Sequence, residues 1–327
     1  MMYPWQADQW QLLLHAKSQR RLPHALLFTG IAGTGKAVFA QHFTSSLFCQ
    51  QLNPDGAPCQ HCHSCRLVEG RVHPGVMWIE PEKAGQAIKI DQVREANEFI
   101  SQTSLQGEYR MVIINPADDM NINAANALLK TLEEPSSGGM LVLISHQGER
   151  LPATILSRCQ KLVFPRPPKS MALSWIKSQI TEQGVNHELL LNLTNGAPLA
   201  AQSLVNDDMM NVRESLFQSM YSLGKKQDDP VKSAAKLYQN EPLRLVDFLL
   251  SWTLDLLKLH INGGLDVVMN TDFANQLIEL KQKTQAPKLN RMLDYLQQLR
   301  AQLCAGMNLN KQLMLENVFI RWMGCLA

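Results

Sequence analysis

A glycine-rich loop at residues 30–37 limits what this chain can fold into more than any other feature. The loop reads Gly-Ile-Ala-Gly-Thr-Gly-Lys-Ala, follows the apolar run Ala25–Phe28 and precedes the helix-like segment Val38–Phe48. In a phosphate-binding loop, glycines let backbone N–H groups surround phosphates at a helix N-terminus, a lysine reaches the outer phosphates, and a Ser or Thr hydroxyl binds Mg²⁺. The candidate phosphate-binding residues are Gly30, Gly33, Gly35 and Lys36.

Ala37 stands where this motif needs its hydroxyl. A methyl group cannot bind a hard cation that prefers oxygen ligands. The loop therefore indicates weakened nucleotide binding or a relic of an active ancestor, and a chance glycine turn stays open as the third interpretation.

The first half of the chain alternates apolar strands with helical stretches, which predicts an α/β fold with a parallel sheet flanked by helices. We expect helices to start after Asp91 and after Asn121 or Asn123, and Pro135 to end the last of them. The predicted strands are Ala25–Phe28, Val76–Ile79, Ile88–Ile90, Met111–Ile114 and Leu141–Ile144. The predicted helices between them are Val38–Phe48, Gln92–Gln102 and Ala124–Leu132.

A composition change at Pro165-Arg166-Pro167-Pro168 marks the first domain boundary. We predict three domains: residues 1–165 as the P-loop α/β domain, 166–205 as a small helical lid, and 206–327 as an all-helical C-terminal domain. Helices are expected at Ser170–Gln183 and His187–Leu193 in the lid. In the last domain, a helix bundle or an oligomerisation domain is indicated by apolar residues at helical spacing: Leu289, Met292, Leu293, Leu296, Leu299, Leu303, Leu309, Leu313, Val318, Phe319 and Trp322.

The formal net charge is +2 over 327 residues. This near balance argues against a strongly basic nucleic-acid binder, although local basic stretches such as Arg20-Arg21, Lys225-Lys226 and Lys281–Arg291 remain. The N-terminus has no signal-peptide pattern, and no apolar run approaches the length of a membrane span. We expect a soluble, cytoplasmic protein with no membrane partner.

Four of the seven cysteines, Cys49, Cys59, Cys62 and Cys65, lie in a short insertion at residues 49–65. Four thiolates at this spacing predict a closed structural metal site holding zinc or an iron–sulfur cluster. Three histidines could replace a ligand but are expected at the surface or at helix ends: His61, His63 and His73. The other cysteines are predicted to be small buried apolar residues: Cys159, Cys304 and Cys325.

The strand Met111–Ile114 lies where a nucleotide-hydrolysing P-loop protein carries an Asp for Mg²⁺ and a Glu that activates water. Here the next residues are Asn115 and Pro116, and neither supplies a carboxylate. Asp118 and Asp119 come two and three residues later, so we expect them to form a turn or a helix cap. ATP binding by this chain is therefore doubtful, and hydrolysis is not expected.

Several stretches together resemble the bacterial clamp-loader AAA+ proteins, densely from Tyr3 to about Arg166 and beyond that only in helical architecture. Besides the loop and the cysteine cluster, they are Tyr3-Pro4-Trp5, Pro23–Leu27, Ile90–Glu95, Asn126–Pro135 and Leu151–Cys159. The resemblance implies an AAA+ module with a zinc-binding insertion, a helical lid and a C-terminal collar.

In that family, the Ser157-Arg158-Cys159 motif implies that Arg158 is an arginine finger for ATP held by an adjacent subunit. Without the family, Arg158 is expected to cap the preceding helix or to pair with a surface acid. Lys36 could contact a phosphate or form an ordinary ion pair with Glu133 or Glu134.

Two further positions correspond to the sensors of the active family members. Leu199, after Gly196-Ala197-Pro198, stands where active relatives carry a sensor arginine. Ser145 or His146 lies at the first sensor position and is expected to be structural here. The loss at Leu199 agrees with those at Ala37, Asn115 and Pro116.

By the same resemblance, the chain is a non-hydrolysing subunit of the clamp loader of the bacterial DNA polymerase III holoenzyme, a DNA-directed DNA polymerase. Its implied partners are the gamma/tau and delta subunits and, through the complex, the β sliding clamp and primer–template DNA. One alternative is an active clamp-loader ATPase of the gamma/tau type. Another is a free-standing zinc module that binds nucleic acid.

Overall fold

The computed structural model describes residues 2–83, 85–102, 109–182, 184–262, 264, 267–307 and 309–326. They form two compact units, Met1–Ala172 with Ala197–Ala200, and Leu173–Gly196 with Ala201–Ala327. The division into three domains at residues 165 and 205 stays a prediction. In the described part of the chain, no helix is both long enough and apolar enough to cross a membrane.

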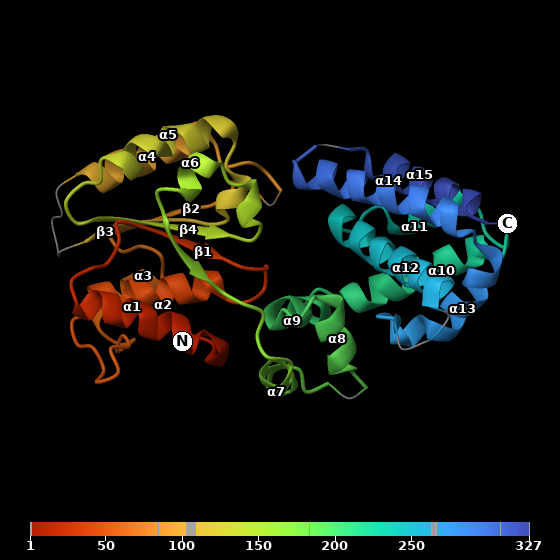
Figure 1. The fold of residues 1–327 in the computed structure, drawn as a ribbon, viewed down its shortest axis with the longest axis horizontal. Coiled ribbons are helices and arrows are strands. Elements are labelled where there is room, and N and C mark those ends of the chain that lie inside the picture. Colours follow the sequence, from red (N-terminus) through yellow and green to blue (C-terminus); the bar gives the residue numbers. More distant parts are fainter. Residues whose placement is uncertain are drawn as a thin grey trace. The chain divides into compact units, whose positions relative to one another are not determined.

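A parallel sheet of five strands forms the centre of the first unit, in the order β2-β3-β4-β1-β5 (Figure 1). The strands are β1 (Ala25–Thr29), β2 (Val76–Ile79), β3 (Arg110–Ile114), β4 (Gly139–Ser145) and β5 (Gln160–Val163). Every residue of β1 and β3 is buried, as expected for parallel strands covered on both faces. The α/β fold predicted from the sequence is confirmed.

Helices cover both faces of the sheet (Figure 1). On one face lie α1 (Ala7–Ser18), α2 (Lys36–Phe48) and α3 (His63–Glu69), and on the other α4 (Ile90–Ser101), α5 (Ile122–Glu133) and α6 (Ala153–Leu156). The described residues of this unit also form three 3₁₀ turns, η1 (Pro4–Gln6), η2 (Ala117–Asp119) and η3 (Gly148–Arg150). Side chains of the central strands alternate between the two apolar layers.

The predicted strand at Ile88–Ile90 is wrong. Ile88 forms only an isolated bridge to Met120, and α4 begins at Ile90. The helix start predicted at Asp91 is also wrong, because the Gln92 side chain accepts a hydrogen bond from the Lys89 N–H and places the cap at Lys89. The predicted start at Asn121 is confirmed, since its side chain accepts the Ala124 N–H at the first turn of α5.

The second unit is helical in its described residues. It contains most of α7 (Lys169–Gln179), then α8 (His187–Leu193), the end of α9 (Pro198–Asn206), α10 (Met209–Gly224), α11 (Pro230–Leu237), α12 (Pro242–Asn262), η5 (Thr271–Phe273), α13 (Ala274–Lys283), α14 (Ala286–Cys304) and α15 (Lys311–Gly324). The helix predicted at Ser170–Gln183 ends at Gln179, and residue 183 lies outside the described part.

The apolar stripes predicted for the last helices are confirmed at most positions. Leu289, Met292, Leu296 and Leu299 of α14 are buried, as are Val318, Phe319 and Trp322 of α15. Leu313, predicted for the same stripe, is 62% exposed, so the prediction is wrong at this position, where the buried residues of the first turns of α15 are Met314 and Leu315.

Candidate functional site

The glycine loop connects β1 to α2 at the carboxyl end of the sheet. Gly30, Gly33 and Gly35 have φ values of 152°, 77° and 86°, which residues other than glycine rarely adopt. A Cβ on Gly30 would lie 2.2 Å from the Phe164 carbonyl oxygen, so the chain passes too closely there for any side chain. The loop thus has the backbone geometry predicted for a phosphate-binding motif.

Lys36, at the first turn of α2, is directed into its own loop. Its Nζ donates to the carbonyl oxygens of Gly30 and Ile31, both at 2.7 Å, and the side chain is 2% exposed. Burial lowers the pKa of Lys36 to about 8, although the nearby carboxylate of Asp118 acts in the opposite direction. Of the two alternatives given for Lys36, the ion pair with Glu133 or Glu134 is therefore wrong, because loop carbonyls accept the hydrogen bonds of this amine.

The N-terminal segment covers the same loop. Trp5 Nε1 and Gln6 Nε2 both donate to the Thr34 carbonyl oxygen, at 2.9 and 3.0 Å. A Cβ on Gly35 would meet the Tyr3 ring at 2.4 Å, so the ring lies directly against the loop. The space beside the loop at Gly35 is occupied by the chain's own side chains.

Residues Ala197–Ala200, which belong to the first unit, cover the loop at Gly33. The Leu199 N–H donates to the Gly33 carbonyl oxygen at 3.1 Å, and a Cβ on Gly33 would lie 2.8 Å from the Ala200 nitrogen. The backbone of Leu199 therefore contacts the loop, at the position where active relatives are expected to carry a sensor arginine.

Asp118 follows β3 and links the carboxyl ends of β3 and β4 through hydrogen bonds. Its carboxylate accepts hydrogen bonds from Ser145 Oγ at 2.6 Å, from the His146 N–H, and from the Gln147 N–H at 3.2 Å. Asp118 lies in the 3₁₀ turn η2, so the expected turn is confirmed, but its carboxylate also accepts hydrogen bonds from residues at the end of β4. Sequence spacing gave no signal for this role, since the contacts span 27 to 29 residues.

Asn115 and His146 complete the polar layer at the strand ends. Asn115 Nδ2 donates to Glu80 Oε1 at 3.2 Å. Burial lowers the pKa of His146 to about 4, and the positive charge of Lys36 acts in the same direction, so the imidazole is neutral near pH 7. A neutral imidazole and an amide supply neither a metal carboxylate nor a strong base for attack by water.

Arg158 lies between α6 and β5, and its side chain is 36% exposed. Its Nη2 pairs with Glu133 Oε1 at 2.8 Å, and its Nη1 donates to the Thr154 carbonyl oxygen at 3.0 Å. Both local roles expected without the family, a helix cap and a surface ion pair, are therefore present. A guanidinium has five N–H donors in a planar fork, so these contacts leave capacity for an outside anion.

The four predicted metal ligands come together. The sulfur atoms of Cys49, Cys59, Cys62 and Cys65 all lie within 4.8 Å of one another. Tetrahedral zinc with bonds of about 2.3 Å needs sulfurs about 3.8 Å apart, so this group fits such a site after a small contraction. Backbone N–H groups point at three of the sulfurs at 3.3 to 3.4 Å, which favours thiolates.

The remaining histidines and cysteines partly differ from expectation. His73 is buried, not at the surface, because its ring packs 4.4 Å from the Phe48 ring and its Nδ1 accepts the Gly75 N–H. Cys325 is buried as predicted, whereas Cys159 and Cys304 are only partly buried. Burial raises the pKa of Cys159 to about 11, which keeps the cysteine beside Arg158 an unreactive thiol.

Two family models match most of the chain. Residues 5–168 match the model described as DNA polymerase III, delta subunit, and residues 207–324 match that of DNA polymerase III, delta subunit, C terminal. The chain is 35% identical over 323 residues to DNA polymerase III subunit delta' of Pseudomonas aeruginosa, covering 98% of this chain and 97% of the relative.

Two further relatives extend the comparison. Subunit delta' of Escherichia coli is 31% identical over 320 residues, covering 98% of this chain and 94% of the relative. DNA polymerase III subunit tau of Bacillus subtilis is 26% identical over 310 residues, covering 87% of this chain and 54% of the relative. The two delta' relatives are thus similar to this chain over nearly the full length of both proteins.

Proposed function

Because the chain belongs to the DNA polymerase III delta' family, we propose that it is a clamp-loader subunit that does not hydrolyse ATP. It helps to load the β sliding clamp onto primed DNA, and it presents Arg158 to ATP held by a neighbouring subunit. Its partners are the gamma/tau and delta subunits, and the β clamp and primer–template DNA through the complex. We place this work in the cytoplasm.

The state of Lys36 carries the first part of this proposal. The amine that would reach a phosphate is buried and donates to the Gly30 and Ile31 carbonyls. Ala37 supplies no hydroxyl, and Asn115 and Pro116 supply no carboxylate, so Mg²⁺ and the attacking water lack protein ligands. The loop serves as a structural turn that joins the sheet to its covering segments.

Exposure and charge support a role in trans for Arg158. Its ion pair with Glu133 is at the surface, where such pairs are worth about 0–1 kcal/mol, so exchange to a triphosphate costs little. A guanidinium spreads its charge over a planar fork that matches phosphoryl oxygens, and it is always protonated. Assembly then couples hydrolysis to the correct placement of this chain beside its neighbour.

The experiment is ATP turnover by the reconstituted clamp loader containing Arg158→Ala. We expect assembly to be unchanged and hydrolysis at the site completed by Arg158 to fall about 10³-fold. Arg166→Ala is the matched control, because Arg166 is an exposed arginine on the segment after β5. Unchanged turnover with Arg158→Ala would remove Arg158 from the mechanism.

The alternative, an active ATPase of the gamma/tau type, is favoured by the similarity to subunit tau. It requires Mg²⁺-dependent ATP turnover by the purified chain that disappears in Lys36→Ala. We expect no turnover above background in either protein, since the missing ligands leave no site for the metal. Turnover that depends on Lys36 would replace the proposal with this alternative.

We further propose that Cys49, Cys59, Cys62 and Cys65 hold one structural zinc ion. Four sulfurs leave no coordination position for a substrate, so the metal would fasten the insertion between α2 and α3. Metal analysis should find about one zinc per chain, and Cys62→Ser should lower both zinc content and thermal stability. Cys304→Ser is the control, because Cys304 lies outside the cluster. Metal-free protein with unchanged stability would contradict this site.

A further inference from the structure

A basic pocket lies between α14 and α15, which pack against each other near the end of the described chain (Figure 1). It has a volume of about 290 Å³, and its lining carries three cations, Lys288, Arg291 and Arg321. The rest of the described lining is Met292, Gly324 and Cys325. Among these described lining residues there is no acidic side chain.

The three cations border the same pocket. Cys325 Sγ contacts the carbonyl oxygens of Lys288 at 3.6 Å and Arg321 at 3.4 Å. The charges of Lys288 and Arg291 both reach this buried thiol, where they oppose the rise in pKa that burial causes. A Cβ on Gly324 would meet no atom within 4 Å, so the pocket is open at that point.

In the described part of the chain, Lys288 and Arg321 contact neutral groups. Lys288 Nζ donates to the Leu326 carbonyl oxygen at 2.8 Å, and Arg321 Nε donates to Asn317 Oδ1 at 3.1 Å. The Arg321 guanidinium lies 4.2 Å from the centre of the Tyr295 ring. These contacts orient the cations without neutralising their charge, and an anion entering the pocket would supply that neutralisation.

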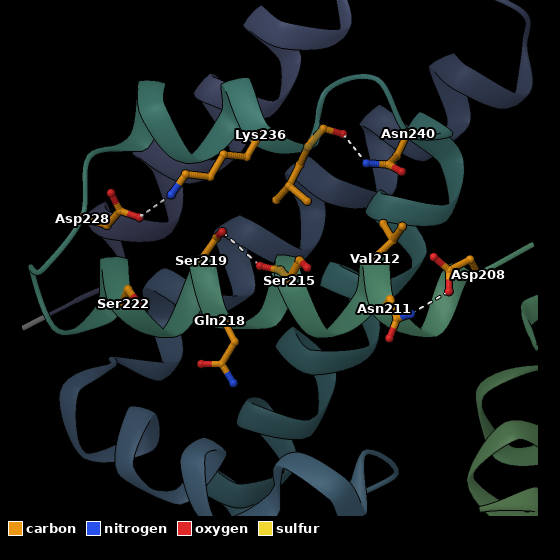
Figure 2. Close-up of a pocket in the computed structure, with 11 residues that line it drawn as sticks. Asp208, Asn211, Val212, Ser215, Gln218, Ser219, Ser222, Asp228, Lys236 and Asn240 are labelled. Carbon is orange, nitrogen blue, oxygen red and sulfur yellow. Dashed lines mark hydrogen bonds and ion pairs between the residues drawn. The ribbon is translucent and has the colours of Figure 1, made fainter. Parts of the chain in front are cut away.

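A second pocket of the same unit provides the contrast, between α10 and α11 (Figure 2). It is larger, at about 510 Å³, but its polar groups bind one another. Lys236 pairs with Asp228 at 3.7 Å, and Asn211 Nδ2 donates to Asp208 Oδ1 at 2.7 Å, as Figure 2 shows. Its one lysine is paired with Asp228 and Asp208 adds a second negative charge, so this pocket shows no preference for an anion.

The sequence around the basic pocket is also more positively charged than the sequence around the second pocket. Residues 281–327 contain seven lysines and arginines and two acidic residues, whereas residues 206–280 contain seven basic and eleven acidic residues. This excess of positive charge favours a polyanion over an isolated small anion. The arginine stacked on Tyr295 adds the kind of flat surface on which nucleic-acid bases stack.

We propose that the pocket formed by Lys288, Arg291 and Arg321 binds a phosphate group of single-stranded nucleic acid. This site is separate from the glycine loop and from Arg158, and it does not depend on the proposed role of either. The two arginines grip the phosphate oxygens as forks, and Lys288 adds a point charge at the rim.

The test is fluorescence anisotropy of a labelled 20-nucleotide single strand with the full chain, at 50 and 150 mM salt. The pocket variant is Arg291→Gln/Arg321→Gln, and the control of equal charge change is Lys226→Gln/Lys232→Gln, two exposed lysines outside the pocket. We expect the pocket variant to bind at least about 10-fold more weakly and its salt slope to fall by about 2, with the control close to wild type. Equal weakening in both variants would overturn the proposal.

Competition identifies the source of the anion. Unlabelled single strand should displace the probe at micromolar concentration, whereas inorganic phosphate and a poly-glutamate peptide of equal charge should need far more. Displacement by inorganic phosphate at the same concentration as the strand would contradict a nucleic-acid ligand, and so would equal displacement by poly-glutamate. Thermal melts of both variants must match wild type, since all four substituted side chains are exposed.

Discussion

Lys36 and Arg158 are two cations that sequence motifs associate with a nucleotide phosphate. They differ in burial and in the groups that they contact. Lys36 is 2% exposed and donates to two carbonyls of its own loop. Arg158 is 36% exposed and pairs with one surface carboxylate, Glu133. The glycine loop keeps the backbone shape of its motif while its lysine is held by the loop's own carbonyls, whereas Arg158 remains accessible at the surface.

The largest effect should come from Arg158→Lys in the reconstituted complex. The substitution keeps the charge but removes the planar fork, so we expect ATP turnover at the completed site to fall by about 10² or more, close to Arg158→Ala. Arg166→Lys, the same change at an exposed arginine, should have no effect. Full activity of Arg158→Lys would mean that charge alone matters and that Arg158 is not a geometric partner of the phosphate.

A smaller effect should appear in the pH dependence of stability. Burial lowers the pKa of Lys36 from 10.5 to about 8, so between these values the unfolded chain binds more protons and the free energy of unfolding rises with pH. Lys36 should contribute up to about 3 kcal/mol of this rise, and Lys36→Met should remove it. Urea denaturation at pH 7.5 to 10 measures the difference. Parallel curves for the two proteins would show that Lys36 is solvated, which would break the comparison.

The smallest effect concerns the cover over the loop. Gly35→Ala forces both a left-handed backbone and a contact with the Tyr3 ring, whereas Gly85→Ala forces only the backbone, because its Cβ would meet nothing within 4 Å. Gly35→Ala should therefore cost about 1–3 kcal/mol more of unfolding free energy than Gly85→Ala. If the two variants are equally stable in urea, the loop is not closed by Tyr3.

Much of this arrangement could be predicted from the sequence, because its signals are local. The glycine loop, the buried strands and the cysteine spacing each depend on neighbouring residues, and the structure places them as expected. Strand β5 was missed because Leu162 is its only buried residue, as suits the edge of a sheet. A strand with one buried residue shows neither the alternation of apolar and polar residues nor the apolar run by which strands are predicted.

The parts that could not be predicted depend on distant contacts. Asp118 bonds to the end of β4, and the Leu199 N–H reaches Gly33 from far along the chain. Whether Lys36 binds a carboxylate or the loop carbonyls depends on how deeply the start of α2 is buried. That burial cannot be read from the sequence of α2 itself. Side-chain partners of this kind follow from tertiary packing, so only the structure reveals them.

The central claim, that the glycine loop no longer serves a nucleotide, is tested most directly by titrating MgATP into the purified chain in a calorimeter. We predict no saturable heat up to millimolar ATP, for wild type and Lys36→Ala alike. Saturable binding with a micromolar dissociation constant that Lys36→Ala abolishes would contradict the account.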